Sequence, residues 1–67
     1  MTKITFNSKS HQMFITIDGE TTSYNDVMTI KNNEGFYEIL QRQQNESVAP
    51  LYRLPLNSTI IEYQHNV

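Results

Sequence analysis

The chain contains no cysteine, only two glycines and two prolines, and no long apolar run within its 67 residues. The absence of cysteine excludes a disulfide framework, a thiolate metal site and a cysteine nucleophile, and with them the usual small secreted scaffolds. No stretch approaches the roughly 18 apolar residues of a membrane helix, and no apolar segment follows Lys3 as in a signal peptide. These absences predict a soluble cytoplasmic protein that does not associate with membranes.

An excess of positive charge is also missing, since seven acidic residues outnumber five basic ones and the formal net charge is −2. Proteins that bind duplex nucleic acid normally carry a basic excess that neutralises several phosphates, so the composition disfavours nucleic acid as a partner. The chain length predicts a single domain over residues 1–67, near the lower limit for folding without staples.

Residues arranged for catalysis or metal binding are absent as well. His11 and His65 are the only histidines, and neither has a neighbouring ligand at metal-site spacing. The carboxylates are scattered singly, and so short a chain has little volume for a cleft that would desolvate an acid. No nucleophile elbow or phosphate-binding glycine loop is present. We therefore expect no enzymatic activity, no metal and no cofactor.

What the sequence does contain is apolar residues alternating with polar ones at period two, which is typical of β-strands. Residues 2–7 and 11–17 both show this pattern and are separated by a four-residue loop at 8–11. Asp18-Gly19 then matches a type I′ hairpin turn. Two antiparallel pairings follow, and because a one-residue slip would expose the apolar face, we expect a fixed register. The predicted partners are Phe6 with Met13, Ile4 with Ile15, Thr2 with Ile17, Ile17 with Glu20, Ile15 with Thr22, and Met13 with Tyr24.

The middle of the chain predicts a second hairpin, with strands at residues 27–31 and 36–44 around a turn at 32–35. In this register Ile30 lies opposite Tyr37 and Met28 lies opposite Ile39. A helix is an alternative for both segments, because Ser23 is a suitable N-cap for the first and the second is rich in good helix formers. The hairpin is preferred because its register works on both faces.

The stretch Val48–Leu56 has strand character but contains Pro50 and Pro55. Proline cannot donate a ladder hydrogen bond and is confined to edges, first positions and bulges. We therefore expect an edge or bent strand here, followed by a turn and a last strand at residues 59–63.

The predicted fold class is all-β or nearly so. Five to seven short antiparallel strands form a small barrel or a compact twisted sheet, with one short helix as an alternative. The expected core is Met13, Ile15, Met28, Ile30, Tyr37, Ile39, Leu54 and Ile61. Phe14, Val27, Phe36 and Leu40 are then left on the other faces. A second small core or a homodimer would cover these four residues.

The candidate partner-binding residues are Leu51, Tyr52 and Arg53 on the proline-containing strand, together with Arg42. Tyr and Arg are enriched at protein interfaces, and flanking prolines block uncontrolled strand addition while keeping the segment rigid. Strict alternation turns Tyr52 inward with Leu54, so its exposure requires a break in the pleat at one of the prolines.

Three functions remain open. The first is a non-enzymatic accessory protein that binds an unidentified protein partner, a role frequent among bacterial and phage proteins of this size. The second is a single-stranded nucleic-acid binder, in which aromatic side chains stack on bases beside cations. The residues for this role are Phe14, Tyr24, Tyr37, Tyr52, Lys31, Arg42 and Arg53. The third is a structural subunit of a homo-oligomeric assembly.

Overall fold

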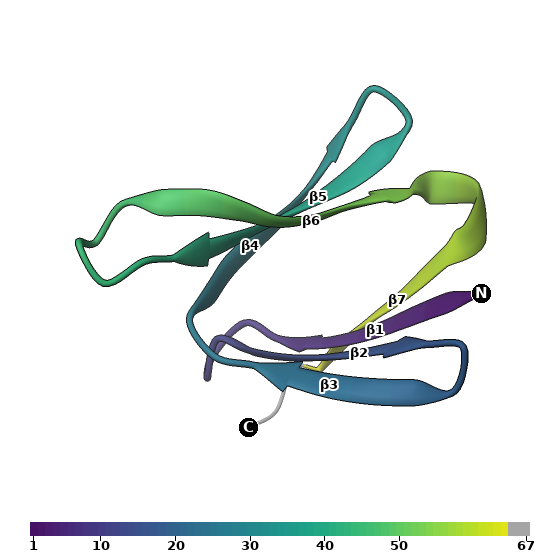
Figure 1. Ribbon diagram of the computed structural model, residues 1–67, viewed down its shortest axis with the longest axis horizontal. Coiled ribbons are helices and arrows are strands. Elements are labelled where there is room, and N and C mark those ends of the chain that lie inside the picture. Colours follow the sequence, from purple (N-terminus) through teal and green to yellow (C-terminus); the bar gives the residue numbers. More distant parts are fainter. Residues whose placement is uncertain (65–67) are drawn as a thin grey trace.

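The computed structural model describes residues 1–64 and consists of seven strands in two sheets (Figure 1). The strands are β1 (Thr2–Asn7), β2 (Gln12–Ile17), β3 (Glu20–Tyr24), β4 (Val27–Asn33), β5 (Phe36–Arg42), β6 (Val48–Pro55) and β7 (Thr59–Gln64). Within the described residues the only helical segment is the 3-10 turn η1 (Leu56–Ser58). The predicted all-β class is confirmed, and residues 36–42 are a strand and not the alternative helix.

Sheet A has the strand order β3-β2-β1-β7. Its two hairpins have the predicted register throughout, with Phe6 opposite Met13 and Ile15 opposite Thr22. Asp18 and Gly19 form the two-residue turn with φ of 51° and 85°, as a type I′ turn requires. The polar strand β3 lies at the sheet edge, and all its residues except the half-buried Tyr24 are exposed.

One pairing in sheet A differs from the antiparallel arrangement expected for all strands. β7 runs parallel to β1, with Thr2 opposite Thr59 and Phe6 opposite Tyr63. A parallel neighbour needs a long crossover connection, and here the whole of sheet B lies between the two strands in the sequence. The alternation of apolar and polar residues is the same in parallel and antiparallel strands, so the sequence pattern does not reveal which pairing β7 adopts.

Sheet B has the strand order β4-β5-β6, which places the proline-containing strand β6 at an edge, as predicted. The predicted β4–β5 register is wrong by two residues, because Ile30 lies opposite Ile39 and not Tyr37. The turn consists of Glu34 and Gly35 alone, with φ of 53° and 81°. A two-residue type I′ turn therefore replaces the expected four-residue turn.

Two β-bulges interrupt sheet B. In β4 the pairing steps from Val27 to Thr29, which makes Met28 the extra residue. In β6 it steps from Pro50 to Tyr52, which makes Leu51 the extra residue. A bulge resets the inward and outward alternation on either side of it. The pleat is therefore interrupted beside Pro50, at Leu51, but not in the way that exposure of Tyr52 required, because Tyr52 stays on the inward side with Leu54.

The core lies between the two sheets and receives side chains from both. Ile4, Phe6, Met13, Ile15, Val27 and Ile39 are buried, and Tyr24, Ile30, Leu51, Tyr52, Leu54 and Ile61 pack against them. The expectation that Val27 lies outside and Met28 inside is wrong, because the bulge turns Val27 into the core, where it is fully buried. Tyr37 is half-buried but is not part of this cluster.

The chain passes between the sheets twice, at residues 25–26 and at η1, and the sheets lie one above the other (Figure 1). Backbone hydrogen bonds fix both crossings: the Val27 amide donates to the His11 carbonyl at 3.0 Å, and the Leu56 amide donates to the Gly35 carbonyl at 3.1 Å. No strand pairing joins sheet A to sheet B among residues 1–64. Of the two predicted arrangements, the compact twisted one fits and the closed barrel does not.

Candidate functional site

The outer face of sheet B is the side of this sheet that points away from the core. Ile39 is buried, so its neighbours along β5 point outward, because successive side chains in a strand alternate between faces. The register then assigns residues of β4 and β6 to the same side. The outer face of sheet B consists of Thr29, Lys31, Asn33, Phe36, Glu38, Leu40, Arg42, Val48, Pro50, Arg53 and Pro55.

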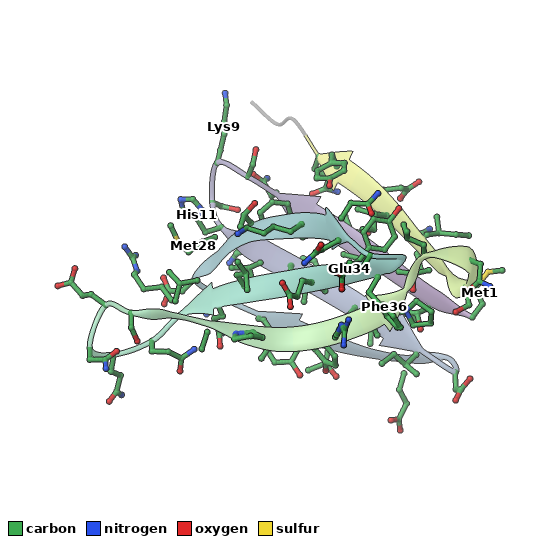
Figure 2. The ribbon with its side chains drawn as sticks, turned by 90° about the horizontal axis from the view of Figure 1, so that it is seen from above. Met1, Lys9, His11, Met28, Glu34 and Phe36 are labelled. Atoms are coloured by element: carbon green, nitrogen blue, oxygen red, sulfur yellow. The ribbon has the colours of Figure 1, made fainter. Side chains whose placement is uncertain are left out.

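Apolar side chains on this face surround a central row of charges. Glu38 lies between Lys31 on β4 and Arg53 on β6. The neighbouring rows pair Phe36 with Pro55 and Leu40 with Pro50. Figure 2 looks onto this sheet from outside, with Phe36 near one end of β5. The face thus combines apolar area with charge, as protein interfaces do.

Arg53 lies over the ring of Phe36, with its guanidinium carbon 4.3 Å from the ring centroid. This cation–π contact holds the Arg53 side chain across the sheet in a defined position. Neither Arg53 nor Lys31 forms a salt bridge with a carboxylate among residues 1–64. Glu38, opposite both residues on the same face, offsets part of their positive charge and leaves a positive excess there.

Arg42, the fourth candidate residue, lies at the other end of β5. Its guanidinium is 3.5 Å from the Asp26 carboxylate, and its backbone amide donates to the Asp26 carbonyl at 2.9 Å. Across the strand pair it lies opposite Val48, which is 50% exposed. The Asp26 carboxylate partly neutralises Arg42, so this residue contributes less free charge to the face than Arg53.

Leu51 and Tyr52 do not occupy the exposed position expected for them. Both are half-buried and pack against the core, because the bulge at Leu51 turns two successive side chains to the inner side. Of the three candidate residues on β6, only Arg53 is exposed. The structure therefore brings Arg53 and Arg42 to the same face and turns Leu51 and Tyr52 away from it.

Tyr52 has a clear role inside the molecule. Its hydroxyl lies 2.7 Å from that of Tyr24 on β3, and the two rings meet edge to face with centroids 5.7 Å apart. This contact ties the edge of sheet A to the edge of sheet B. The hydrogen bond with Tyr24 and the burial of the side chain both raise the pKa of Tyr52 above its ordinary value.

The aromatic residues proposed for base stacking do not converge. Phe14 lies on the outer side of sheet A, and Tyr24 and Tyr52 pack into the core from two different sheets. The cations Lys31, Arg42 and Arg53 share the outer face of sheet B. Within residues 1–64 the aromatic ring on that face is Phe36, which already lies under the Arg53 guanidinium. The arrangement lacks the row of free rings that single-strand binders use.

A cleft of about 420 Å³ opens between the sheets beside the tyrosine contact. It is lined by Ile15, Ile17, Asp18, Glu20, Thr22 and Tyr52. Its polar groups are the carboxylates of Asp18 and Glu20 and the hydroxyls of Thr22 and Tyr52.

Two further features complete the survey of residues 1–64. No group of three or more histidine or acidic side chains is placed to hold a metal ion, and His65 lies outside the described residues. No helix in this part of the chain has the length and apolar character needed to cross a membrane.

Sequence reasoning named Phe36 and Leu40 only as apolar residues left outside the core, and did not connect them with Arg53. The connection depends on the β5–β6 register, in which Arg42 lies opposite Val48 and Glu38 lies opposite Arg53. Counting back from the turn at residues 43–47 gives the Arg42–Val48 pair. The bulge at Leu51 then shifts every pair beyond it by one residue, and the period-two pattern alone does not reveal that shift.

Comparison with protein families, with curated proteins and with solved structures gives no match for this chain.

Proposed function

We propose that this protein acts without catalysis, in the cytoplasm, by binding an acidic and partly apolar surface of another protein through the outer face of sheet B. The observation that carries the proposal is the distribution of charge. Three of the five cationic residues of the chain, Lys31, Arg42 and Arg53, lie on this face, against a single carboxylate on it, that of Glu38. An interface of this kind gains specificity and association rate from complementary charge, so it selects an acidic partner.

The apolar residues supply the area that such a contact needs. Phe36 and Leu40 are half-buried among their neighbours, and Val48, Pro50 and Pro55 are exposed. Prolines and a short three-stranded sheet make a platform that loses little conformational entropy on binding. Pro50 and Pro55 also interrupt the donors along the edge of β6, so the partner is expected to contact the face and not to extend the sheet there.

The experiment places a photo-crosslinking amino acid at Asn33, at the margin of the face, and for comparison at Thr21 on sheet A. A partner that crosslinks from Asn33 and not from Thr21 is then purified, and its affinity for the unmodified protein is measured. We expect a protein with an acidic patch, whose binding weakens as salt is raised.

Two double variants that change the net charge by the same amount distinguish the effect of charge on this face from the effect of the overall charge of the protein. Lys31→Glu with Arg53→Glu is expected to weaken binding by about tenfold or more, because both reversals oppose the partner's charge. Lys3→Glu with Lys9→Glu makes a charge reversal of the same size elsewhere and is expected to leave the affinity within about twofold. Equal losses from the two variants would contradict the proposal, as would a captured species that is a nucleic acid.

A matched apolar pair tests the other half of the surface. Leu40→Ser on the outer face of sheet B is expected to reduce the affinity for the purified partner. Phe14→Ser makes a similar change on the outer side of sheet A, where Phe14 is 46% exposed, and is expected to leave the affinity unchanged. Binding that depends on Phe14 and not on Leu40 would move the interface to the other sheet.

A further inference from the structure

The two sheets have four edges, and three of them carry features that hinder the addition of another strand. β6 has two prolines and a bulge, β4 has a bulge at Met28 and an exposed lysine, and β3 is short and polar. Such features are how proteins protect exposed sheet edges. The fourth edge, β7 (Thr59–Gln64), has no proline, no glycine and no bulge. It is the one edge in residues 1–64 that is open to a further strand.

The side chains of β7 favour pairing with another strand. Ile60 and Tyr63 are 47% and 52% exposed, which is high for large apolar residues. The single charged residue of the strand, Glu62, lies 3.7 Å from Lys3 of the neighbouring strand β1. An incoming strand therefore meets β-branched and aromatic side chains with no unpaired charge among them.

We propose that β7 pairs antiparallel with β7 of a second copy of this chain, so that two four-stranded sheets join into one sheet of eight strands. The two-fold axis passes through Ile61 and its symmetry mate. Thr59 then lies opposite Tyr63 of the second copy, and Ile60 lies opposite Glu62 of the second copy. A two-fold contact of this type uses the same surface on both copies and closes after two chains.

The residues of β7 determine this register. Each residue must oppose one of the same face, because directly opposite side chains in an antiparallel pair project to the same side. An axis through Glu62 would place two carboxylates directly opposite each other, which is destabilising. An axis through Ile60 would bring Ser58 of η1 into the ladder, where the chain is no longer extended. The axis through Ile61 keeps five residues paired and produces a central Ile–Ile pair with two Thr–Tyr pairs.

This self-complementarity is the reason for proposing a second copy as the occupant. β-branched residues pair well with aromatic and other β-branched residues, and in this register both members of each such pair come from the same six-residue strand. The dimer interface lies on the edge of sheet A and leaves the outer face of sheet B free. The two contacts can therefore be tested separately.

The test measures self-association by sedimentation velocity over concentrations on the order of 10 μM to 1 mM, since a single strand pair buries less area than a standard interface. The wild type is expected to shift from monomer to dimer in this range. Backbone amides of residues 59–63 are expected to become more protected from hydrogen exchange as the concentration rises. A wild type that stays monomeric at the highest concentration overturns the proposal.

Substitutions of opposite charge at Ile60 test the register. Ile60→Glu places a carboxylate opposite Glu62 of the second copy at two positions and is expected to weaken the dimer roughly tenfold. Ile60→Lys places an ammonium group there and is expected to keep or strengthen the dimer. Equal weakening by both variants overturns the register.

Monomer stability controls for simple misfolding, because Ile60 lies opposite Lys3 within its own chain. In the monomer, a charge at position 60 meets both Lys3 and the Glu62 carboxylate two residues along the same face, one like and one unlike charge for either variant, so the two variants are expected to be similar in monomer stability. Phe14→Glu removes another exposed apolar residue of sheet A, two strands away from β7, and is expected to leave the association unchanged. Loss of the dimer in that variant overturns the proposal.

Discussion

Sheets A and B are built from similar parts but differ in regularity. Each contains a hairpin closed by a two-residue turn with glycine in second place, Asp18-Gly19 in sheet A and Glu34-Gly35 in sheet B. Sheet A runs without interruption through all its pairings, whereas sheet B has bulges at Met28 and Leu51. The regular sheet supplies four of the six buried core residues, and the interrupted sheet carries three of the five cationic residues on its outer face.

The bulges explain this division of roles. A regular strand offers only every second side chain to the core, so two sheets of short strands bury few residues. The extra residue at Leu51 lets β6 turn both Leu51 and Tyr52 inward while Arg53 still points outward. Sheet B thereby contributes to the core without giving up its outer face. Predictions about the core, the tyrosine contact and the turns test this comparison, from the largest expected effect to the smallest.

Truncation of one fully buried residue in each sheet has the largest expected effect. Ile15→Ala in sheet A and Ile39→Ala in sheet B are each expected to cost about 2–5 kcal/mol, because both side chains fill the same core and leave a cavity when shortened. Urea denaturation followed by circular dichroism and by tyrosine fluorescence measures the loss. Val48→Ala, at a position that is 50% exposed, is the control and is expected to change stability by less than about 0.5 kcal/mol.

The two core variants also test whether the sheets form one cooperative unit. A single cluster that joins both sheets predicts one unfolding transition, with both optical probes changing together. Two separate transitions, with one sheet surviving the loss of the other, would show that the division into sheets is also a division in stability.

An intermediate effect is expected from the tyrosine contact between the sheets. Tyr24→Phe or Tyr52→Phe each removes one hydroxyl of the 2.7 Å pair and leaves the other without its partner, at a cost of about 1 kcal/mol. The double variant is expected to lose less than the sum, because the two residues share one interaction. Additive losses would mean that the hydroxyl pair does not couple the sheets. Tyr63→Phe, at an exposed residue, is the control.

The same contact predicts a dependence on alkaline pH. The pKa of Tyr52 is raised in the folded protein, first by the hydrogen bond with Tyr24 and then by burial, so folding favours the neutral phenol. Its contribution to stability is complete below the unfolded pKa of about 10 and is lost as the pH rises through the higher folded pKa. Urea melts at increasing pH should show this decline in the wild type, and Tyr52→Phe should show less of it.

The smallest effect concerns the two turns. Glu34 has a positive φ of 53°, in the left-handed region, which costs energy for a residue without the local hydrogen bonding of Asn or Asp. Glu34→Asn is expected to stabilise the protein by about 0.5 kcal/mol, because Asn-Gly suits a type I′ turn. Asp18→Asn, at the equivalent position in sheet A, is expected to change stability little. Thermal melts of both variants measure the difference, and equal shifts would remove this contrast between the sheets.

Most of sheet A was predictable because its signals are local. Asp18-Gly19 determines one turn, and the alternation of Ile4, Phe6, Met13 and Ile15 permits only one register without exposing the core. Sheet B was predictable in its elements but not in its register. Val27-Met28 and Leu51-Tyr52 are adjacent pairs of large apolar residues, and period two cannot say which member faces inward. Each bulge occurs at one of these pairs, but Met13-Phe14 and Ile60-Ile61 in sheet A are similar pairs without a bulge, so the pairs alone do not locate an interruption.

The candidate surface was predicted in part. Arg53 and its place on a proline-protected edge followed from the sequence, and strict alternation already turned Tyr52 inward with Leu54. The contact of Tyr52 with Tyr24, 28 residues away, did not follow from it. The cation–π contact between Arg53 and Phe36 likewise depends on the register between β5 and β6. Local patterns carry no information on either contact. A role of these residues in binding a partner stays a prediction.

The parallel pairing of β1 with β7 has a consequence for the order of folding. Every other strand pairing joins neighbours in the chain, but Thr2 and Thr59 are 59 − 2 = 57 positions apart. A contact between residues so far apart in the sequence forms late in folding. The intervening chain must lose conformational entropy before the contact contributes any stability. During synthesis β1 keeps one unpaired side until the last strand emerges from the ribosome. We therefore expect refolding to be slower than the local hairpins alone would give, with the addition of β7 as the final step.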